Sequence, residues 1–257
     1  MEEIRNKQGF ICDMDGVIYH GNILLDGVKE FVEWLNRENK SYLFLTNSPE
    51  RTPLELSHKL ARMGLDVSED HFYTSALATA KFLKNQMDNA SAYVIGEGGL
   101  MNALYDAGIY MNDVSPDYVV VGETRTYNFE KIEKAIALVN KGARLIGANP
   151  DVTGPTETGI MPATGSLIAP IEIATGKKAY FVGKPNPLIL RHAVKKLGIR
   201  SQDTVIIGDR MDTDIVSGIE SSIDTVLVLS GVTSEDEVSN FPYRPKFILN
   251  GVGDIIR

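Results

Sequence analysis

The chain has 257 residues, of which 43% are hydrophobic and 23% charged, and these values are typical of a globular protein that can hold two domains. A net charge of −8 argues against nucleic acid as a partner, since binding its phosphates requires clustered lysine and arginine. No signal-peptide pattern and no apolar run near the ~20 residues of a membrane helix are present, so we expect a cytoplasmic protein with no membrane partner.

The first predicted element is a short buried strand over the apolar run Gly9–Cys12. The only cysteine, Cys12, lies inside it. A single cysteine cannot form an internal disulfide and suits a reducing compartment. We therefore expect Cys12 to be a small buried apolar residue and not a nucleophile.

Two carboxylates follow this strand. Asp13 and Asp15 are two residues apart, so their side chains point the same way while the chain stays extended, and Gly16 then permits a sharp turn. Like charges this close need a cation between them or a retained proton. Taken alone, the motif fits an ordinary strand exit as well as it fits a catalytic or metal site. A calcium loop is excluded because its twelfth position holds Leu24 in place of glutamate.

Three later apolar runs have the same design, in which a polar group follows a predicted strand. Continuous apolar runs are typical of parallel strands covered on both faces, and parallel strands end at one edge of a sheet. We expect that edge to gather all these polar side chains, although each alone could be a helix cap, a surface lysine or a turn residue. The runs are Tyr42–Leu45 before Thr46 and Asn47, Ala179–Val182 before Lys184, and Thr204–Ile207 before Asp209 and Asp214.

Spacing predicts an inserted domain. The stretch 16–45 holds little more than a turn, a short flap and one helix over 28–37, whereas 47–183 is far longer than one crossover needs. We place the insert at 80–178 and the core at 1–79 and 179–257. Further helices are expected near 53–63 and 75–84, and near 100–107, 129–141 and 167–175 in the insert. The insert also has expected strands at 92–95, 118–121 and 144–146, and a turn-rich stretch at 149–165.

These motifs, in this order, resemble those of haloacid dehalogenase (HAD) superfamily phosphatases, most closely the NagD-like class. The resemblance covers nearly the whole chain and implies an α/β fold: a doubly wound, Rossmann-like parallel-sheet core with an inserted α/β cap domain. The four motifs are Asp13–Val17, Thr46–Asn47, Lys184–Pro185 and Gly208–Asp214. Similar segments outside them are Tyr73–Ala76, Gly122–Asn128, Asn149–Asp151 and Leu229–Val232.

The resemblance implies a role for four of the acidic motif residues. Asp13 is expected to be the nucleophile that forms an aspartyl-phosphate, and Asp15 the general acid and base. Mg²⁺ would bind the Asp13 carboxylate, the Asp15 backbone carbonyl and Asp209. Asp214 would act from behind these ligands, through water or Lys184.

The remaining site residues are expected to contact the substrate. The Thr46 hydroxyl and the Asn47 N–H would hold phosphoryl oxygens, and Lys184 would offset their charge. Substrate choice would fall to the stretch 149–166, with Asn149 and Asp151 as polar contacts. As a turn residue, Asp151 could instead bond its own backbone.

These expectations favour a Mg²⁺-dependent phosphatase that hydrolyses small phosphorylated metabolites, either sugar phosphates or nucleoside monophosphates. Two alternatives stay open: a phosphotransferase or phosphomutase of the same superfamily, and a receiver-like module that accepts one phosphoryl group without turnover. The partner is then a small-molecule phosphoester, and the family resemblance leaves a homodimer formed through the cap open.

Overall fold

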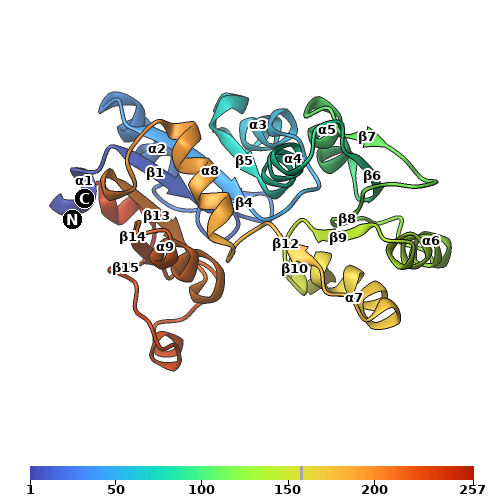
Figure 1. Ribbon diagram of the computed structural model, residues 1–257. Coiled ribbons are helices and arrows are strands. Elements are labelled where there is room, and N and C mark those ends of the chain that lie inside the picture. Colours follow the sequence, from blue (N-terminus) through green and yellow to red (C-terminus); the bar gives the residue numbers. More distant parts are fainter. Residues whose placement is uncertain (157–158) are drawn as a thin grey trace. The chain divides into compact units, whose positions relative to one another are not determined.

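A computed structural model describes residues 1–156 and 159–257 (Figure 1). The chain divides into two compact units. The first unit consists of 1–46, 56–73 and 184–257, and the second of 47–55 and 74–183. Within the described residues, no helix has the length and apolar character needed to cross a membrane.

The first unit contains a sheet whose neighbouring strands from β15 through β4 pair in parallel. Strand order runs outward from β1 in both directions, toward β4 on one side and toward β13 on the other. This reversal is the topological switch point at which open α/β sheets bind ligands, outside the carboxyl ends of their strands. In sheet order the strands are β15 (Phe247–Leu249), β14 (Asp224–Val228), β13 (Thr204–Gly208), β1 (Gly9–Cys12), β4 (Ser41–Thr46) and β5 (Phe72–Thr74).

Helices cover this sheet. Helix α8 (Pro187–Leu197) packs on β1 and β4, and its ends have clear local causes. The Asn186 side chain accepts the Leu188 N–H, proline occupies the first turn, and Gly198 ends the helix in the left-handed conformation. The other helices of this unit are α1 (Glu2–Arg5), α2 (Val28–Arg37), α3 (Pro53–Arg62, which begins in residues of the second unit) and α9 (Val216–Glu220). A small hairpin, β2 (Tyr19–His20) with β3 (Ile23–Leu24), occupies the position of the expected flap.

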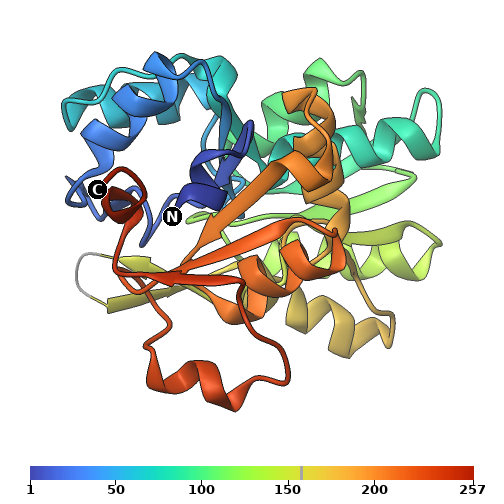
Figure 2. The same cartoon turned by 90° about the vertical axis from the view of Figure 1, so that its left-hand side faces the viewer.

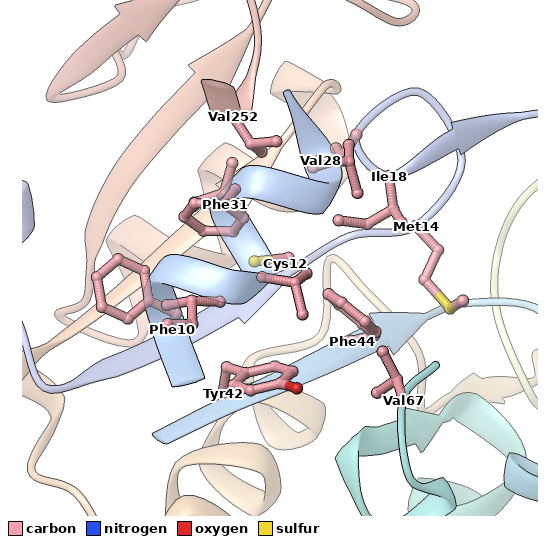
Figure 3. Close-up of a cluster of buried hydrophobic side chains, with 14 of the residues drawn as sticks. Phe10, Cys12, Met14, Ile18, Val28, Phe31, Tyr42, Phe44, Val67 and Val252 are labelled. Atoms are coloured by element: carbon pink, nitrogen blue, oxygen red, sulfur yellow. The ribbon is translucent and has the colours of Figure 1, made fainter. Parts of the chain in front are cut away.

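A cluster of buried apolar side chains lies on one side of this sheet (Figure 3). Phe10 and Cys12, two residues apart on β1, both belong to it, as alternation along a strand requires. Phe10 meets Trp34 edge to face, with ring centroids 5.5 Å apart. The prediction for Cys12 is confirmed: the thiol is buried, and burial raises its pKa above the ordinary value.

The second unit is built on its own parallel sheet. Three of its strands contain the runs expected at 92–95, 118–121 and 144–146, and helices separate these runs along the chain. In sheet order the strands are β12 (Tyr180–Phe181), β9 (Arg144–Gly147), β8 (Tyr118–Val121), β6 (Ser91–Ile95) and β7 (Tyr110–Met111). The helices are α4 (Ser75–Gln86), α5 (Gly98–Asp106), α6 (Phe129–Asn140) and α7 (Thr164–Thr175).

One predicted strand belongs to the other sheet. The run Ala179–Val182 was expected to join the sheet of Asp13, but β12 within it pairs with β9 in the second unit. Only two residues of β12 pair with β9, and the Phe181 side chain adds packing because it lies against Gly147, where β9 has no side chain. A Cβ on Gly147 would lie 2.3 Å from the Phe181 ring.

The bounds of the units also differ from the expected insert at 80–178. The second unit begins earlier, at Thr74, whose hydroxyl caps α4 by accepting the Leu77 N–H at 3.2 Å. It ends later, at Gly183, because β12 belongs to its sheet. It also includes 47–55, where the Glu50 carbonyl accepts the Gly99 N–H at 3.0 Å.

The turn-rich stretch 149–165 contains an antiparallel hairpin (Figure 2). Its strands are β10 (Thr153–Thr156) and β11 (Gly159–Pro162), and Pro155 lies opposite Ile160. Proline is tolerated because each strand of a two-stranded ladder has a free edge. Residues 157–158 of the predicted specificity stretch lie outside the described residues.

Gly147→Ala should destabilise the second unit, because the added methyl group overlaps the Phe181 ring. Overpacking of this kind costs about 1–3 kcal/mol in the free energy of unfolding. Urea unfolding followed by circular dichroism measures it. Gly98→Ala is the matched control, since nothing lies within 4 Å of a Cβ placed there. Equal stability of the two variants would contradict the packing argument, and adding Phe181→Leu to Gly147→Ala should restore part of the loss.

Candidate active site

Asp13 and Asp15 follow β1 at the switch point of the first sheet. The Asp13 N–H donates to the Ile207 carbonyl at 2.8 Å, which extends the pairing of β1 with β13 by one residue. Gly16 then turns the chain with a φ of 79°, and its N–H donates to the Tyr19 carbonyl at 2.9 Å. The Tyr19 hydroxyl donates to Asp15 Oδ2 at 3.4 Å. Both aspartates thus lie at the start of a tight turn.

Lys184 bridges two of the predicted acidic residues. Its Nζ lies 2.5 Å from Asp13 Oδ1 and 2.7 Å from Asp214 Oδ1. The lysine side chain is only 3% exposed, so its charge is compensated by carboxylates and not by water. Burial alone would lower the pKa of Lys184, but the carboxylates of Asp13 and Asp214 raise it by more, so the pKa lies above its ordinary value.

Asp209 and Asp214 reach this point because glycines leave room for them. A Cβ on Gly208 would lie 2.2 Å from Asp214 Cβ, and one on Gly231 would lie 2.1 Å from Asp209 Oδ2. Asp214 belongs to a π-helical turn, Met211–Ile215, a distortion frequent at functional sites. Asp209 Oδ2 accepts the Val232 N–H at 2.8 Å.

Asp13, Asp209 and Asp214 form an acidic cluster in which one carboxylate oxygen from each lies within 4.8 Å of the others. Burial raises the pKa of Asp13 well above its ordinary value, with further raising by Asp214 and Asp209 against the opposing effect of Lys184. Burial and Asp214 raise the pKa of Asp209 to about 7. Both carboxylates are therefore costly to ionise without an additional positive charge.

Thr46 is the last residue of β4, and Asn47 is the first residue of the second unit. Thr46 is buried at the last position of the strand. Asn47 Nδ2 donates to Asp151 Oδ2 at 2.8 Å, and the Asn47 carbonyl accepts from Asn149 Nδ2 at 2.8 Å. The structure thus brings the predicted residues Asn47, Asn149 and Asp151 together within the second unit.

The placement of Asn149 does not support the substrate contact expected of it. Its side chain is fully buried, and both of its amide hydrogens donate to protein oxygens, on Asn47 and on Glu123. Its Oδ1 accepts the Asp151 N–H at 3.1 Å. The amide therefore has no free donor to offer a ligand.

Glu123 was quoted in the resemblance without a role, yet it is a buried carboxylate at the centre of these contacts. Ser48 Oγ donates to its Oε2 at 2.9 Å. The sequence carries a signal for it: the apolar run Tyr118–Val121, then Gly122 and an acid, has the same design as the run Thr204–Ile207, then Gly208 and Asp209.

The chain matches two family descriptions: residues 10–110 match haloacid dehalogenase-like hydrolases, and 181–255 match HAD-hydrolase-like proteins. It is 47% identical to dihydroxyacetone phosphatase of Corynebacterium glutamicum (strain R), an alignment that covers 96% of this chain and 90% of that one. It is 45% identical to ribonucleotide monophosphatase NagD of Escherichia coli (strain K12), with 95% and 96% covered.

The chain belongs to the NagD-like class of HAD superfamily phosphatases. The solved structure of NagD from the E. coli K-12 strain superimposes with a TM-score of 0.92 at 43% identity, over 97% of this chain and 98% of that one. As a HAD-type phosphatase, the protein is a phosphoric monoester hydrolase, and its α/β fold is that of the class.

Phosphatases of this superfamily generally use a divalent metal, and the acidic cluster fits one. Asp209 Oδ1 is buried and, within the described part of the chain, has no hydrogen-bond partner. Orphaned buried carboxylate oxygens are unfavourable unless a cation takes the place of a donor. Three carboxylates against the single ammonium group of Lys184 also leave the cluster with excess negative charge. The donor set, all carboxylate oxygen, suits a hard cation.

A divalent cation should stabilise the folded protein through this cluster. At a concentration about a hundredfold above its dissociation constant, binding adds about 2.7 kcal/mol to the free energy of unfolding. Melting temperatures with Mg²⁺ and with EDTA measure the effect. Asp209→Asn should lose most of it, whereas Asp212→Asn, an exposed acid nearby, should keep it. An equal shift in Asp209→Asn and in wild type would exclude Asp209 as a ligand.

The stabilisation by Mg²⁺ should increase as pH rises. Because the folded-state pKa of Asp209 is raised, to about 7, the metal-free folded protein retains a proton that the unfolded chain loses. Its stability should fall as pH rises from roughly 4, near the ordinary value for Asp, to 7. Cation binding requires the ionised carboxylates, so the Mg²⁺-induced shift in melting temperature should be larger at pH 8 than at pH 5.5.

Proposed function

We propose that this phosphatase hydrolyses small phosphorylated metabolites, sugar phosphates or nucleoside monophosphates, with Mg²⁺ and through an aspartyl-phosphate on Asp13. The observation that carries the proposal is the cluster of Asp13, Asp209 and Asp214 around Lys184, in which one oxygen of Asp209 has no hydrogen-bond partner among residues 1–156 and 159–257. Such a cluster can attract a cation, and with it a phosphoryl group.

Asp13 is the nucleophile in this proposal. A carboxylate oxygen attacks phosphorus, the bond from phosphorus to the ester oxygen breaks, and an acyl phosphate forms. Its partial exposure, 14% of the side chain, distinguishes it from Asp214, which is 1% exposed and is better placed to orient Lys184. The ion pair between Lys184 and Asp214 agrees with the expectation that Asp214 acts through Lys184.

Asp15 moves the proton in both steps. It donates a proton to the departing ester oxygen, and then takes one from the water that attacks the acyl phosphate and releases inorganic phosphate. The Tyr19 hydroxyl at 3.4 Å gives this carboxyl a neutral hydrogen-bonding neighbour.

Lys184, Thr46 and Asn47 hold the transferring group. The Lys184 ammonium offsets the charge of the phosphoryl oxygens, while the Thr46 hydroxyl and the Asn47 N–H donate to them. Mg²⁺, held by the Asp13 carboxylate, the Asp15 backbone carbonyl and Asp209, would supply the charge needed to stabilise the transition state. Phosphoryl transfer depends mainly on positioning and electrostatics, which this set provides.

The relatives leave the substrate class broad, since one is named for dihydroxyacetone phosphate and another for ribonucleotide monophosphates. The groups above contact only the phosphoryl end that all phosphoesters share, so discrimination falls to other residues. We assign it to the stretch 149–166, which includes the hairpin β10–β11. A cytoplasmic location and a homodimer formed through the second unit remain part of this proposal.

Asp13→Asn should abolish turnover, because an amide cannot attack phosphorus and is a poor metal ligand. The loss should exceed a thousandfold in kcat with an aryl phosphate. Circular dichroism and the melting temperature check that the variant is folded. Activity within tenfold of wild type in pure, folded protein would refute the nucleophile assignment.

Asp15→Ala should separate the two chemical steps. A nitrophenolate leaving group needs little proton donation, so Asp13 can still be phosphorylated, whereas hydrolysis of the acyl phosphate lacks its base. Mass spectrometry after acid quench should then find a phosphate on Asp13. A phosphate on another residue, or normal turnover, would show that Asp15 does not have this role.

A further inference from the structure

Glu123 is a buried acid that the proposed reaction does not use. It follows β8 in the second unit and is only 8% exposed. Its two oxygens have different partners: Oε1 accepts from Asn149 Nδ2 at 3.0 Å, and Oε2 accepts from Ser48 Oγ at 2.9 Å. The carboxylate therefore joins two segments that are distant in sequence.

Asn149 carries this connection to the segment that follows β4. Its second amide hydrogen donates to the Asn47 carbonyl at 2.8 Å, and the Ser75 hydroxyl donates to the same carbonyl. Asp151 Oδ2 accepts from Asn47 Nδ2 at 2.8 Å. The peptide between Asn47 and Ser48 is thus held by its carbonyl on one side and by the Ser48 hydroxyl on the other.

The last residue of the second unit lies against the same contacts. A Cβ on Gly183 would lie 2.7 Å from Asn47 Oδ1 and 2.9 Å from Asn149 Cβ, so this position accepts only glycine at its present spacing. The Gly183 N–H donates to the Ala148 carbonyl at 2.8 Å. Asn47 and Gly183 are therefore neighbours in space, and the next residues along the chain beyond them are Thr46 and Lys184.

The acid is retained at a cost in stability. Burial raises the pKa of Glu123 to about 7, and the nearby acids Glu50 and Asp151 raise it further, against the hydrogen bonds from Asn149 and Ser48. Protonation does not break the connection, since the carbonyl oxygen of a carboxylic acid still accepts from Asn149 and its O–H can donate to Ser48 Oγ. The two oxygens of Glu123 therefore keep Asn149 and Ser48 in place whether or not the carboxyl group is ionised.

We propose that Glu123 and Asn149 are positioning residues for the phosphoryl site: they fix the backbone at Asn47 and Gly183, and so the residues next to them in the chain, Thr46 directly before Asn47 and Lys184 directly after Gly183. The proposal rests on the proposed function, in which those residues hold the transferring phosphoryl group. A displacement of about 1 Å in such groups can cost a hundredfold in rate.

Glu123→Leu and Glu123→Gln test it as a pair. Leucine fills the space but removes both hydrogen bonds, whereas glutamine can accept from Asn149 and donate to Ser48 Oγ. The measurements are kcat and KM for a featureless aryl phosphate, and the inhibition constant of inorganic phosphate. Glu97→Leu is the matched control. Glu97 is also a carboxylate that accepts two hydrogen bonds, from the Thr124 hydroxyl and the Arg125 N–H, and these two residues directly follow Glu123 in the chain.

Glu123→Leu should lower kcat/KM about 10- to 100-fold and weaken inhibition by inorganic phosphate at least tenfold. Glu123→Gln should stay within about threefold of wild type on both measures, and Glu97→Leu should match wild type. A folded Glu123→Leu variant with wild-type affinity for inorganic phosphate would overturn the proposal, even if its melting temperature were lower. Asp13→Asn tests the proposed function separately, because a dead Asp13→Asn beside a normal Glu123→Leu refutes only the positioning role.

Asn149→Asp tests the same connection without opening a cavity, and decides the matter if Glu123→Leu does not fold. The new carboxylate faces Glu123, with Glu50 and Asp151 nearby, and cannot donate unless protonated. Its kcat/KM relative to wild type should therefore fall as pH rises from 5.5 to 8, with a matching loss of phosphate inhibition. A ratio that is constant and near one across this range would exclude the role of Asn149.

Discussion

A buried ammonium group holds the site of this phosphatase together. Lys184 Nζ contacts Asp13, which follows β1, and Asp214, in the π-helical turn after β13. With lysine and Asp214 almost wholly enclosed, neither charge can be satisfied by water, and loss of one partner would leave the other uncompensated at a cost of about 3–5 kcal/mol. The contact therefore constrains where both strands end.

The fold makes this concentration of charge possible by its topology and by its glycines. Strand order reverses at β1, and β1 pairs with β13 in parallel, so the carboxyl ends of these two strands are adjacent. Gly208 and Gly231 then remove the side chains that would occupy the space of Asp214 and Asp209. Polar groups are common at the edge of such a sheet. Three carboxylates with oxygens within 4.8 Å of one another fit here only because these two positions are glycine.

Much of this could be predicted from sequence, because apolar runs and chain order depend on local features. The runs at Gly9–Cys12 and Thr204–Ile207 become neighbouring parallel strands, and the long gap between Asn47 and Lys184 contains a second sheet. Helix α8 carried its own signals, an asparagine cap before proline and a closing glycine, which the prediction left unused.

The errors have physical causes as well. A two-residue strand such as β12 can pair with any parallel edge, and its choice of β9 is decided by the fit of Phe181 over Gly147, which no local pattern expresses. The contact between Ser48 and Glu123 joins residues 75 positions apart, so its existence depends on tertiary packing. The hydrogen-bond partners of Asn149 could not be predicted for the same reason: its polarity is visible in the sequence, but the protein groups that its amide contacts are not.

The division of the chain bears on how members of this class can be recombined. The second unit ends at Gly183, and the bridging lysine is the next residue, while its first segment begins directly after Thr46. A domain exchange cut at the strand ends expected from sequence would separate β12 from β9, or would join Asn47 of one parent to Asn149 of another. Chimeras that retain both 47–55 and 74–183 from a single parent keep these contacts intact, so the natural unit of exchange is two segments and not one.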